Sequence, residues 1–427
     1  MNATPVNATA APRTAVTRTR EECAALDAAD PLARFRAEFV LPEGVVYLDG
    51  NSLGVLPART PERVRQVVEQ EWGQQLIRSW NEAGWFAKPH TLGARVAPLL
   101  GAAAGQVVVC DTTSVNLFKV LAAALRLRPG RSTVLAERAA FPTDLYIAEG
   151  VGSLTDGGAR TELIDSADRL ADHLGPDTAV VLLSLVDYRT GELLDLPAVT
   201  RQVQAAGALM VWDVCHAVGA LPVELDANGV DFAVGCTYKY LNSGPGSPAF
   251  LYVAERHLAE AAQPLSGWFG HARPFDFEPG YQPVPGIGRF LTSSPSLLGQ
   301  AALESSLEIW EQVDLAEVRA KSLALTELFI ELVEPLAEYG VEVVTPREPG
   351  RRGSQVALRH PDGYPVVQAL IARGVIGDFR APDLMRFGFT PLYLSYTEVW
   401  DAARQLTEVL ESEEWREERF GRRGEVT

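Results

Sequence analysis

Short apolar runs that alternate with helical patterns dominate the first 290 residues, and this rhythm constrains the fold more than any other feature of the sequence. The candidate strands are 45–48, 107–110, 133–136, 179–185, 209–213, 232–236 and 249–253, and helical stretches such as 115–127 and 196–206 lie between most of them. Near-continuous runs of Val, Leu and Ile are typical of parallel strands that are covered on both faces. The sequence therefore predicts an α/β fold with a mostly parallel sheet.

The pattern changes after about residue 295. Helical segments at 297–312 and 315–336 precede candidate strands at 341–344, 355–358, 375–379 and 384–387, and a last helix begins near Thr397. This order is typical of a smaller α+β domain. We expect a disordered tail over residues 1–20, a segment over 21–58 that joins the small domain, a large domain over 59–294 and a small domain over 295–427.

Charge and cysteine content argue against several classes of protein. The net charge is −17 and the sequence pI is about 4.9, which disfavours binding to nucleic acid or to an anionic membrane. The four cysteines are widely spaced and form no CxxC motif, so neither a disulfide scaffold nor a zinc site is expected. The N-terminus lacks the apolar stretch of a secretory signal, although a transit peptide is a minor alternative. We expect a cytoplasmic protein without metal.

Two polar residues that follow predicted buried strands indicate chemistry. Asp213 ends the strand 209–213, and Lys239 stands between two tyrosines just after the strand 232–236. Open α/β sheets bind ligands at the carboxyl ends of their strands. A desolvated lysine forms a Schiff base, and a carboxylate keeps the pyridine nitrogen of pyridoxal 5'-phosphate protonated. The pair favours this cofactor, and the alternatives are a helix cap at Asp213 and a solvated lysine.

Three further segments suit the same cofactor and an amino-acid substrate. Thr113 and Ser114 lie at the predicted start of a helix, where N–H groups and hydroxyls bind a phosphate dianion or form an ordinary cap. Phe141 suits the face of the pyridine ring and Asp144 its polar network, although both also suit a helix start. Arg386 is a charge in an apolar strand, which suits a substrate carboxylate or a buried ion pair.

Together these segments resemble the kynureninase family, whose members are pyridoxal phosphate enzymes of the aspartate-aminotransferase fold (fold type I, similar to class V aminotransferases). The matching stretches run in family order through residues 45–393: Tyr47 to Gly54, Thr113 to Leu117, Phe141 to Asp144, Tyr188 to Gly191, Asp213 to His216, Tyr238 to Asn242, Ser266 to Gly270 and Arg386 to Tyr393. Asn-Ser-Leu-Gly and Tyr-Lys-Tyr-Leu-Asn-Ser-Gly-Pro-Gly are highly specific as a set, whereas the phosphate-loop piece alone is not.

The resemblance implies hydrolysis of L-kynurenine, or of its 3-hydroxy form, to anthranilate or 3-hydroxyanthranilate and L-alanine. It implies that Lys239 holds the cofactor and moves protons at Cα, that Asp213 pairs with the pyridinium nitrogen, and that Tyr238 binds the phosphate and assists proton transfer. Other implied cofactor contacts are Thr113, Ser114, Phe141, Asp144 and His216, with Trp268 and Ser294 supplied by the second subunit of a homodimer. The implied substrate contacts are Arg386 at the α-carboxylate and Ser52 and Phe269 near the aryl ring.

Two positions depart from the family pattern. Asp187 stands where relatives often have an amide, and we expect its charge to act near the cofactor. Ser294 replaces a Thr or Asn in a region linked to the choice between kynurenine and its 3-hydroxy form. The small hydroxyl of Ser294 suggests a preference for the unhydroxylated ring.

Rival functions share most of these residues. A cysteine desulfurase of the same fold needs a nucleophilic cysteine in the small domain, and no cysteine follows Cys236. An aminotransferase of this fold would use Lys239, Asp213 and Arg386 equally well. A catalytically silent relative that only binds a ligand is the third alternative, and the complete Asp213 and Lys239 pair argues against it.

Overall fold

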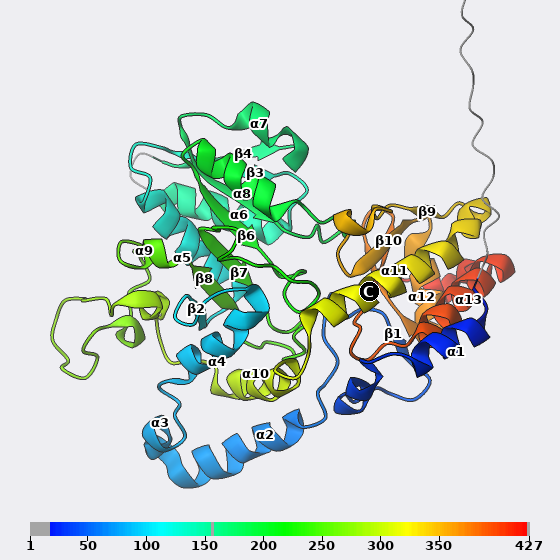
Figure 1. Ribbon diagram of the computed structural model, residues 1–427, viewed down its shortest axis with the longest axis horizontal. Helices are drawn as coiled ribbons and strands as arrows, with labels where there is room; N and C mark the ends of the chain where they lie inside the picture. Colours follow the sequence, from blue (N-terminus) through cyan, green and yellow to red (C-terminus); the bar gives the residue numbers. More distant parts are fainter. Residues whose placement is uncertain (1–17, 155–157, 425–427) are drawn as a thin grey trace, which may run out of the picture.

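A central sheet organises the larger of two lobes in the computed structural model, which describes residues 18–154 and 158–424 (Figure 1). The strand order is β2-β8-β7-β6-β5-β3-β4. Neighbouring strands are parallel except where β8 pairs with β2 and β7. The strands are β2 (Val107–Val109), β3 (Thr133–Glu137), β4 (Arg160–Ile164), β5 (Thr178–Ser184), β6 (Leu209–Asp213), β7 (Phe232–Gly235) and β8 (Phe250–Val253). The predicted mostly parallel α/β fold is confirmed.

Helices cover both faces of this sheet because alternate strand residues point to opposite sides. Met210 and Trp212 of β6 pack in the core beneath α4 (Lys88–Val96) and α8 (Leu196–Ala205). Leu209 and Val211 pack in a second core with α5 (Thr113–Arg126) and α6 (Pro142–Leu154). The other helices of this lobe are α2 (Thr60–Gln66), α3 (Ser79–Glu82), α7 (Leu170–His173), α9 (Glu255–Leu258) and α10 (Leu297–Trp310), and a π-helical segment spans Val67–Gln75.

The smaller lobe contains an antiparallel sheet in the order β12-β13-β10-β9 and a parallel pair, β1 with β11. Its strands are β1 (Val46–Tyr47), β9 (Glu342–Val343), β10 (Gln355–Arg359), β11 (Val375–Ile376), β12 (Asp378–Arg380) and β13 (Leu384–Gly388). Its helices are α1 (Arg20–Ala28), α11 (Leu315–Val333), α12 (Gly363–Ala372) and α13 (Tyr396–Ser412). Short 3₁₀ turns include Trp268–Gly270 and Gly286–Phe290 in the large lobe and Glu334–Tyr339 in the small lobe.

The N-terminal segment packs on the small lobe. The Asp27 carboxylate accepts hydrogen bonds from the backbone N–H groups of Tyr396 at 2.6 Å and Thr397 at 3.0 Å, which begin α13. Figure 1 shows α1 beside α13 although the two helices are far apart in the chain. Most of the predicted tail lies outside the described residues, and its last residue, Arg20, begins α1.

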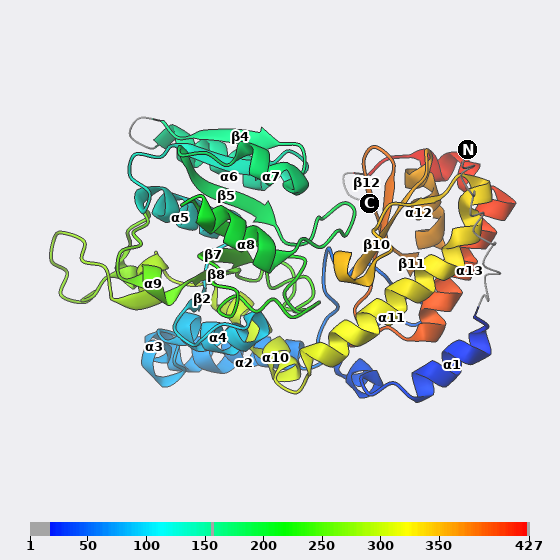
Figure 2. The same ribbon diagram turned by 45° about the horizontal axis from the view of Figure 1, so that its top comes forward.

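The chain passes between the lobes twice. Residues 49–59 lead from β1 to α2, and α10 is followed by α11, which runs through the small lobe (Figure 2). Helix α10 packs against α2 and α4, whereas α11 packs against α13. The domain boundaries stay predictions, and this packing favours a limit after Trp310 rather than at 294. Within the described ranges, no helix combines the length and apolar character that crossing a membrane requires.

Candidate active site

An amine and an imidazole meet where β6 and β7 end. Lys239 Nζ lies 3.2 Å from Nε2 of His216. Burial, followed by the charges of Lys239 and Arg386, holds the pKa of His216 well below its usual value. The imidazole is therefore neutral at pH 7, and Nε2 can accept a hydrogen bond from the Lys239 amine.

Two carboxyl groups lie on the other side of the same site. Asp213 is 8% exposed, and its Oδ1 accepts a hydrogen bond from the backbone N–H of Cys215 at 2.7 Å. Asp144, in the first turn of α6, lies within hydrogen-bonding reach of Asp213. Burial and the charge of Asp213 raise the pKa of Asp144 well above its ordinary range. Asp144 therefore carries a proton, which it can offer to Asp213 in a hydrogen bond.

The N-terminus of α5 forms a third side. Thr112 caps the helix, since its hydroxyl accepts a hydrogen bond from the N–H of Val115 at 3.3 Å. The first backbone N–H groups of a helix have no partner within it, so those near Thr113 and Ser114 can bind an anion. Thr113 Oγ1 lies 3.8 Å from Cys215 Sγ, which places this helix start beside the end of β6.

These three sides fit pyridoxal phosphate. Asp213 is buried and forms no ion pair within the ranges that the structure describes, so a pyridinium N–H would supply the cation that this carboxylate lacks. Lys239 offers the amine for the aldehyde, and the start of α5 offers donors for the phosphate. The donor set thus matches the cofactor that the sequence predicts.

Two aromatic residues lie at this site. Phe141, directly before α6, is 46% exposed and makes an edge-to-face contact with Tyr188, with ring centroids 5.3 Å apart. A half-exposed ring beside the Asp144 turn is free to cover a flat ligand. Burial raises the pKa of Tyr238, so its hydroxyl stays protonated at neutral pH, and Lys239 Nζ is 5.9 Å from its ring centroid.

Arg386 lies in a buried ion pair, which was one of the two alternatives for this residue. Its Nε donates to Asp378 Oδ1 at 2.7 Å, and Nη2 donates to Oδ2 of the same carboxylate. Nη2 also donates to Ser52 Oγ at 3.0 Å, and Nη1 donates to the carbonyl of Tyr188. Of the five guanidinium N–H groups, only the second on Nη1 is left for a further ligand.

Ser52 belongs to this ion-pair cluster. Its hydroxyl donates to Asp378 Oδ2 at 2.7 Å, so the structure places it beside the guanidinium of Arg386. Asp378 was missed in the sequence, although it is an acid in a short apolar stretch. It stands directly opposite Arg386 in the β12–β13 ladder. Arg380, 2.8 Å from Asp378, was missed as well.

Two further acids near the site, Asp49 and Asp187, differ in their surroundings. Burial, with the charge of Asp378 second, raises the pKa of Asp49 to about 7. Asp187 Oδ1 accepts hydrogen bonds from the N–H of Arg189 at 3.1 Å and of Thr190 at 2.6 Å. Asp187 therefore closes its own turn, and it also helps burial to raise the pKa of Glu137 to about 7.

Trp268, Phe269 and Ser294 form a second group. Trp268 and Phe269 pack in an aromatic cluster with Trp80 and Phe86, and the Phe86 and Phe269 centroids are 4.8 Å apart. Ser294 is exposed and follows Thr292, whose carbonyl accepts from the Phe269 N–H at 3.4 Å. The structure thus groups Phe269 with Trp268, rather than with Ser52 and Arg386.

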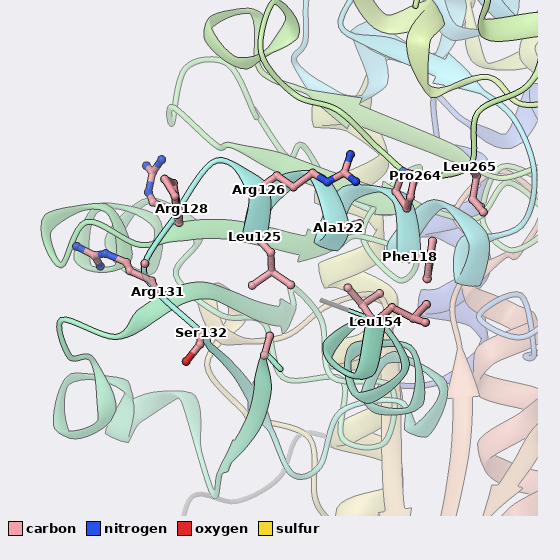
Figure 3. A pocket seen from close by; sticks show the side chains of 14 residues that line it. Phe118, Ala122, Leu125, Arg126, Arg128, Arg131, Ser132, Leu154, Pro264 and Leu265 are labelled. Atoms are coloured by element: carbon pink, nitrogen blue, oxygen red, sulfur yellow. The ribbon is translucent and has the colours of Figure 1, made fainter. Parts of the chain in front are cut away.

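A hollow of about 490 Å³ lies away from these groups, where side chains of α5 and α6 face each other (Figure 3). Phe118, Leu125 and Leu154 line it. Arg128 and Arg131, also at this hollow, donate to the backbone carbonyls of Gly207 and Thr178, each at 2.8 Å. It shares no residue with the Lys239 site.

Comparison with known proteins gives a consistent result at the level of sequence. A family model described as the kynureninase C-terminal domain matches residues 318–406. Kynureninases from Burkholderia pseudomallei (strain 1106a) and Pseudomonas fluorescens are each 52% identical to this chain. Each match covers 96% of this chain and 100% of the relative.

Solved structures with a similar fold include a cysteine desulfurase from Thermococcus onnurineus, with a TM-score of 0.75 and 18% identity over 89% of this chain and 98% of that chain. A variant of the enzyme C-DES with glycine covalently linked to the pyridoxal phosphate cofactor matches with a TM-score of 0.74 and 18% identity. That match covers 87% of this chain and 98% of the other. At such identities the likeness concerns the fold, and it confirms the predicted fold type I.

Proposed function

The chain belongs to the kynureninase family and is a pyridoxal phosphate enzyme that hydrolyses kynurenine, and we propose how its own residues carry that reaction. The observation that carries the function is 52% identity to kynureninases over the whole length of those relatives. It supports cleavage of the Cβ–Cγ bond of L-kynurenine to give anthranilate and L-alanine, in the kynurenine pathway. Nothing favours the aminotransferase or the catalytically silent alternative.

Lys239 is the proposed catalytic base and acid at Cα. When bound, pyridoxal phosphate supplies an electron sink for the charge that develops at Cα. The Lys239 amine first holds the cofactor aldehyde, and it then takes and returns protons at the substrate Cα. Neutral His216, 3.2 Å from Nζ, accepts a hydrogen bond from this amine and orients it. Tyr238, whose hydroxyl is protonated, delivers a proton during carbon–carbon cleavage.

The remaining cofactor contacts divide between ring and phosphate. Asp213 pairs with the pyridinium nitrogen, and protonated Asp144 donates to Asp213 and holds it in place. Phe141 covers the ring. Thr113 and Ser114 bind the phosphate through backbone N–H and hydroxyl groups at the start of α5, together with the Tyr238 hydroxyl.

Arg386 is the proposed partner of the substrate α-carboxylate, through its Nη1 edge. Asp378 fixes the opposite edge of the guanidinium, and Ser52 donates to Asp378 while accepting from Arg386. Ser52 therefore acts by orienting Arg386, in addition to any contact with the aryl ring.

A homodimer completes the proposed site. Trp268 and Ser294 lie in one surface segment with exposed apolar neighbours, including Phe275 at 65% exposed, and the buried ring of Phe269 packs against Trp268. We assign this segment to the active site of the second subunit, where Trp268 and Ser294 reach the phosphate and Phe269 lies near the substrate ring. The acidic chain and its small-molecule chemistry favour a cytoplasmic location, without nucleic-acid or membrane partners.

The test uses purified holoenzyme and L-kynurenine without an amino acceptor. Anthranilate fluorescence should appear, with one L-alanine per anthranilate. Accumulation of pyridoxamine phosphate instead would indicate an aminotransferase. Lys239→Ala should lose both the visible absorption of the Schiff base and its bleaching by borohydride. If the variant keeps that absorption, the cofactor is bound to a side chain other than Lys239.

The small Ser294 hydroxyl supports a preference for kynurenine over 3-hydroxykynurenine. The comparison is kcat/KM for the two substrates, with Ser294→Asn as the variant that adds an amide. A clear advantage for 3-hydroxykynurenine in the parent protein would overturn this assignment.

A further inference from the structure

Lys119 is a buried cation that the proposed mechanism does not use. It lies on α5, about two turns from the helix start, and its side chain is 0% exposed. Its Nζ donates to Oδ2 of Asp111 and, at 2.5 Å, to the carbonyl of Phe290. Burying an ammonium is costly, so these two contacts are needed to hold it.

Asp111 occupies a demanding position beside the phosphate-binding turn. It directly precedes the helix cap Thr112, and its φ of +48° lies in the left-handed region that a non-glycine residue rarely adopts. Its backbone is fixed, because its carbonyl accepts from the N–H of Ala249 at 2.9 Å. A carboxylate so placed opposes a dianion at the start of α5 unless a cation balances it.

Phe290 connects the same lysine to a second functional segment. It ends the 3₁₀ turn Gly286–Phe290, four residues before Ser294. The Lys119 ammonium therefore joins the entrance of α5 to the segment that carries Ser294. The start of α5 is assigned to the phosphate of its own subunit's site, and the segment of Ser294 to the phosphate of the neighbouring subunit's site.

We propose that Lys119 is a positioning residue for the cofactor phosphate: it balances the Asp111 carboxylate and fixes that carboxylate and the 286–290 turn around the start of α5. This inference rests on the proposed phosphate contacts of Thr113 and Ser114. With Asp111 balanced by Lys119, the partial positive charge at the start of α5 acts on the phosphate dianion without an opposing carboxylate charge. Lys119 itself touches no substrate.

The test compares pyridoxal phosphate with pyridoxal, which lacks the phosphate, on apoenzyme prepared from each variant. The measured quantity is the ratio of the two affinities. Lys119→Met should lower this ratio about tenfold, the scale of one uncompensated charge several ångström away. Asp111→Asn should raise the ratio, since an unbalanced cation is left. The double variant should return to the parent ratio, since both charges are gone.

Lys321→Met is the matched control. Lys321 is also buried, and its Nζ contacts one carboxylate, Asp30, and one carbonyl, Pro391, each at 2.6 Å. It lies on α11 in the small lobe, so its loss should lower stability but leave the affinity ratio unchanged. A Lys119→Met effect that is equal for both ligands would make Lys119 a purely structural residue.

Asp111→Asn and one further variant, Ser114→Ala, keep the proposal testable. If Lys119→Met does not fold, Asp111→Asn alone decides, and an unchanged or lowered ratio overturns the proposal. Ser114→Ala separates the proposal from its premise. If that variant leaves the ratio unchanged, the phosphate assignment at the start of α5 is wrong; if it lowers the ratio while the Lys119 series does not, only the role of Lys119 is wrong.

Discussion

Two pairs of carboxyl groups lie side by side in this protein, and in each pair one member keeps a proton. In the first pair, Asp144 is the protonated member and Asp213 is the acceptor. In the second, the Arg386 guanidinium helps to hold the pKa of Asp378 below its usual value, while burial and Asp378 raise that of Asp49. In both pairs, burial and the charge of the neighbouring acid raise the pKa of one member.

Asp49 predicts a measurable pH dependence of stability. Its pKa is about 7 in the folded state against 3.8 as a reference, so the folded protein binds more protons between these values. Stability from this group is therefore present below pH 4 and is lost as the pH rises to about 7. We expect Asp49→Asn to gain about 1–3 kcal/mol in unfolding free energy, relative to the parent, between pH 5 and pH 8.

Denaturant titrations of both proteins at several pH values measure this gain. Glu43→Gln, an exposed acid on the same segment, serves as the control and should show no such trend. A difference between Asp49→Asn and the parent that stays constant with pH would contradict the assignment.

Arg386→Ala should weaken substrate binding and leave the cofactor in place. We expect KM for kynurenine to rise about 10–100-fold, the scale of one charge-assisted hydrogen bond. Stability should fall by about 3 kcal/mol, because Asp378 loses its bidentate partner in a buried site. Steady-state kinetics and visible absorption separate the two effects, and loss of the bound chromophore would mean that Arg386 supports the fold alone.

The sequence was sufficient for most single residues at the Lys239 site, because strand ends of a parallel sheet meet at one edge. Lys239 and Asp213 could be placed together on that basis, whereas His216 came from the resemblance to the family. Asp378 could not be placed in this way, because its role depends on the register between β12 and β13, which cannot be read from the sequence. For the same reason, only the structure could show that Arg386 lies in a buried ion pair, which was one of its two predicted roles.

At the scale of elements, the segment after β1 contacts the catalytic turn directly. The N–H of Gly54 donates to the carbonyl of Tyr238 at 2.7 Å. A Cβ at position 54 would overlap the carbonyl oxygen of Lys239 and lie 2.7 Å from Asn242 Cα. Because these atoms belong to the backbone, they cannot swing away as a side chain does.

Gly54→Ala should therefore displace the turn that carries Lys239. We expect kcat to fall at least about tenfold, the order found for small displacements of catalytic groups. Gly150→Ala in α6 is the control, since a Cβ there meets nothing within 4 Å. Absorption spectra and kcat are compared for both variants. Full activity in Gly54→Ala would show that residues 49–54 can shift without displacing the turn that carries Lys239.

Element boundaries show where sequence patterns fail. The strand β4 was not predicted, because Arg160–Ile164 lies at the edge of the sheet and is largely polar. The predicted strand 375–379 divides at Gly377 into β11 and β12, which join different sheets. Thr60, a residue type that often caps helices, instead lies inside α2: its hydroxyl is 2.6 Å from that of Ser305, and Arg59 precedes the helix. Tertiary partners decided each of these cases.

For the whole molecule, a shared active site predicts complementation between inactive variants. Lys239→Ala removes the amine from one site, and Trp268→Ala removes the contact that we assign to the neighbouring site. After dissociation and random reassociation, about a quarter of all sites should contain neither change. Kynurenine hydrolysis by the mixture should recover accordingly, whereas each variant alone stays impaired.

The control is a mixture of Lys239→Ala with Lys239→Met, a second inactive variant at the same residue. No site in this mixture contains the lysine, so kynurenine hydrolysis should not recover. If the Trp268→Ala mixture shows only the average activity of its components, Trp268 serves its own subunit.

For the whole molecule, the alternation of apolar runs and helical patterns predicted the fold, but the partner surface came only from the family resemblance. The sequence pattern does not show which apolar residues are exposed or face a partner.

Residues 48–54 are bonded to both lobes within a span of seven residues. The carbonyl of Leu48 accepts from the N–H of Gly388 in the small lobe, and Gly54 donates to Tyr238 in the large one. A displacement of one lobe against the other would therefore act on this segment, which is hydrogen-bonded to the turn that carries Lys239. A circular permutant cut between 48 and 54 would break the covalent continuity of this segment between the small lobe and the turn of the reactive amine.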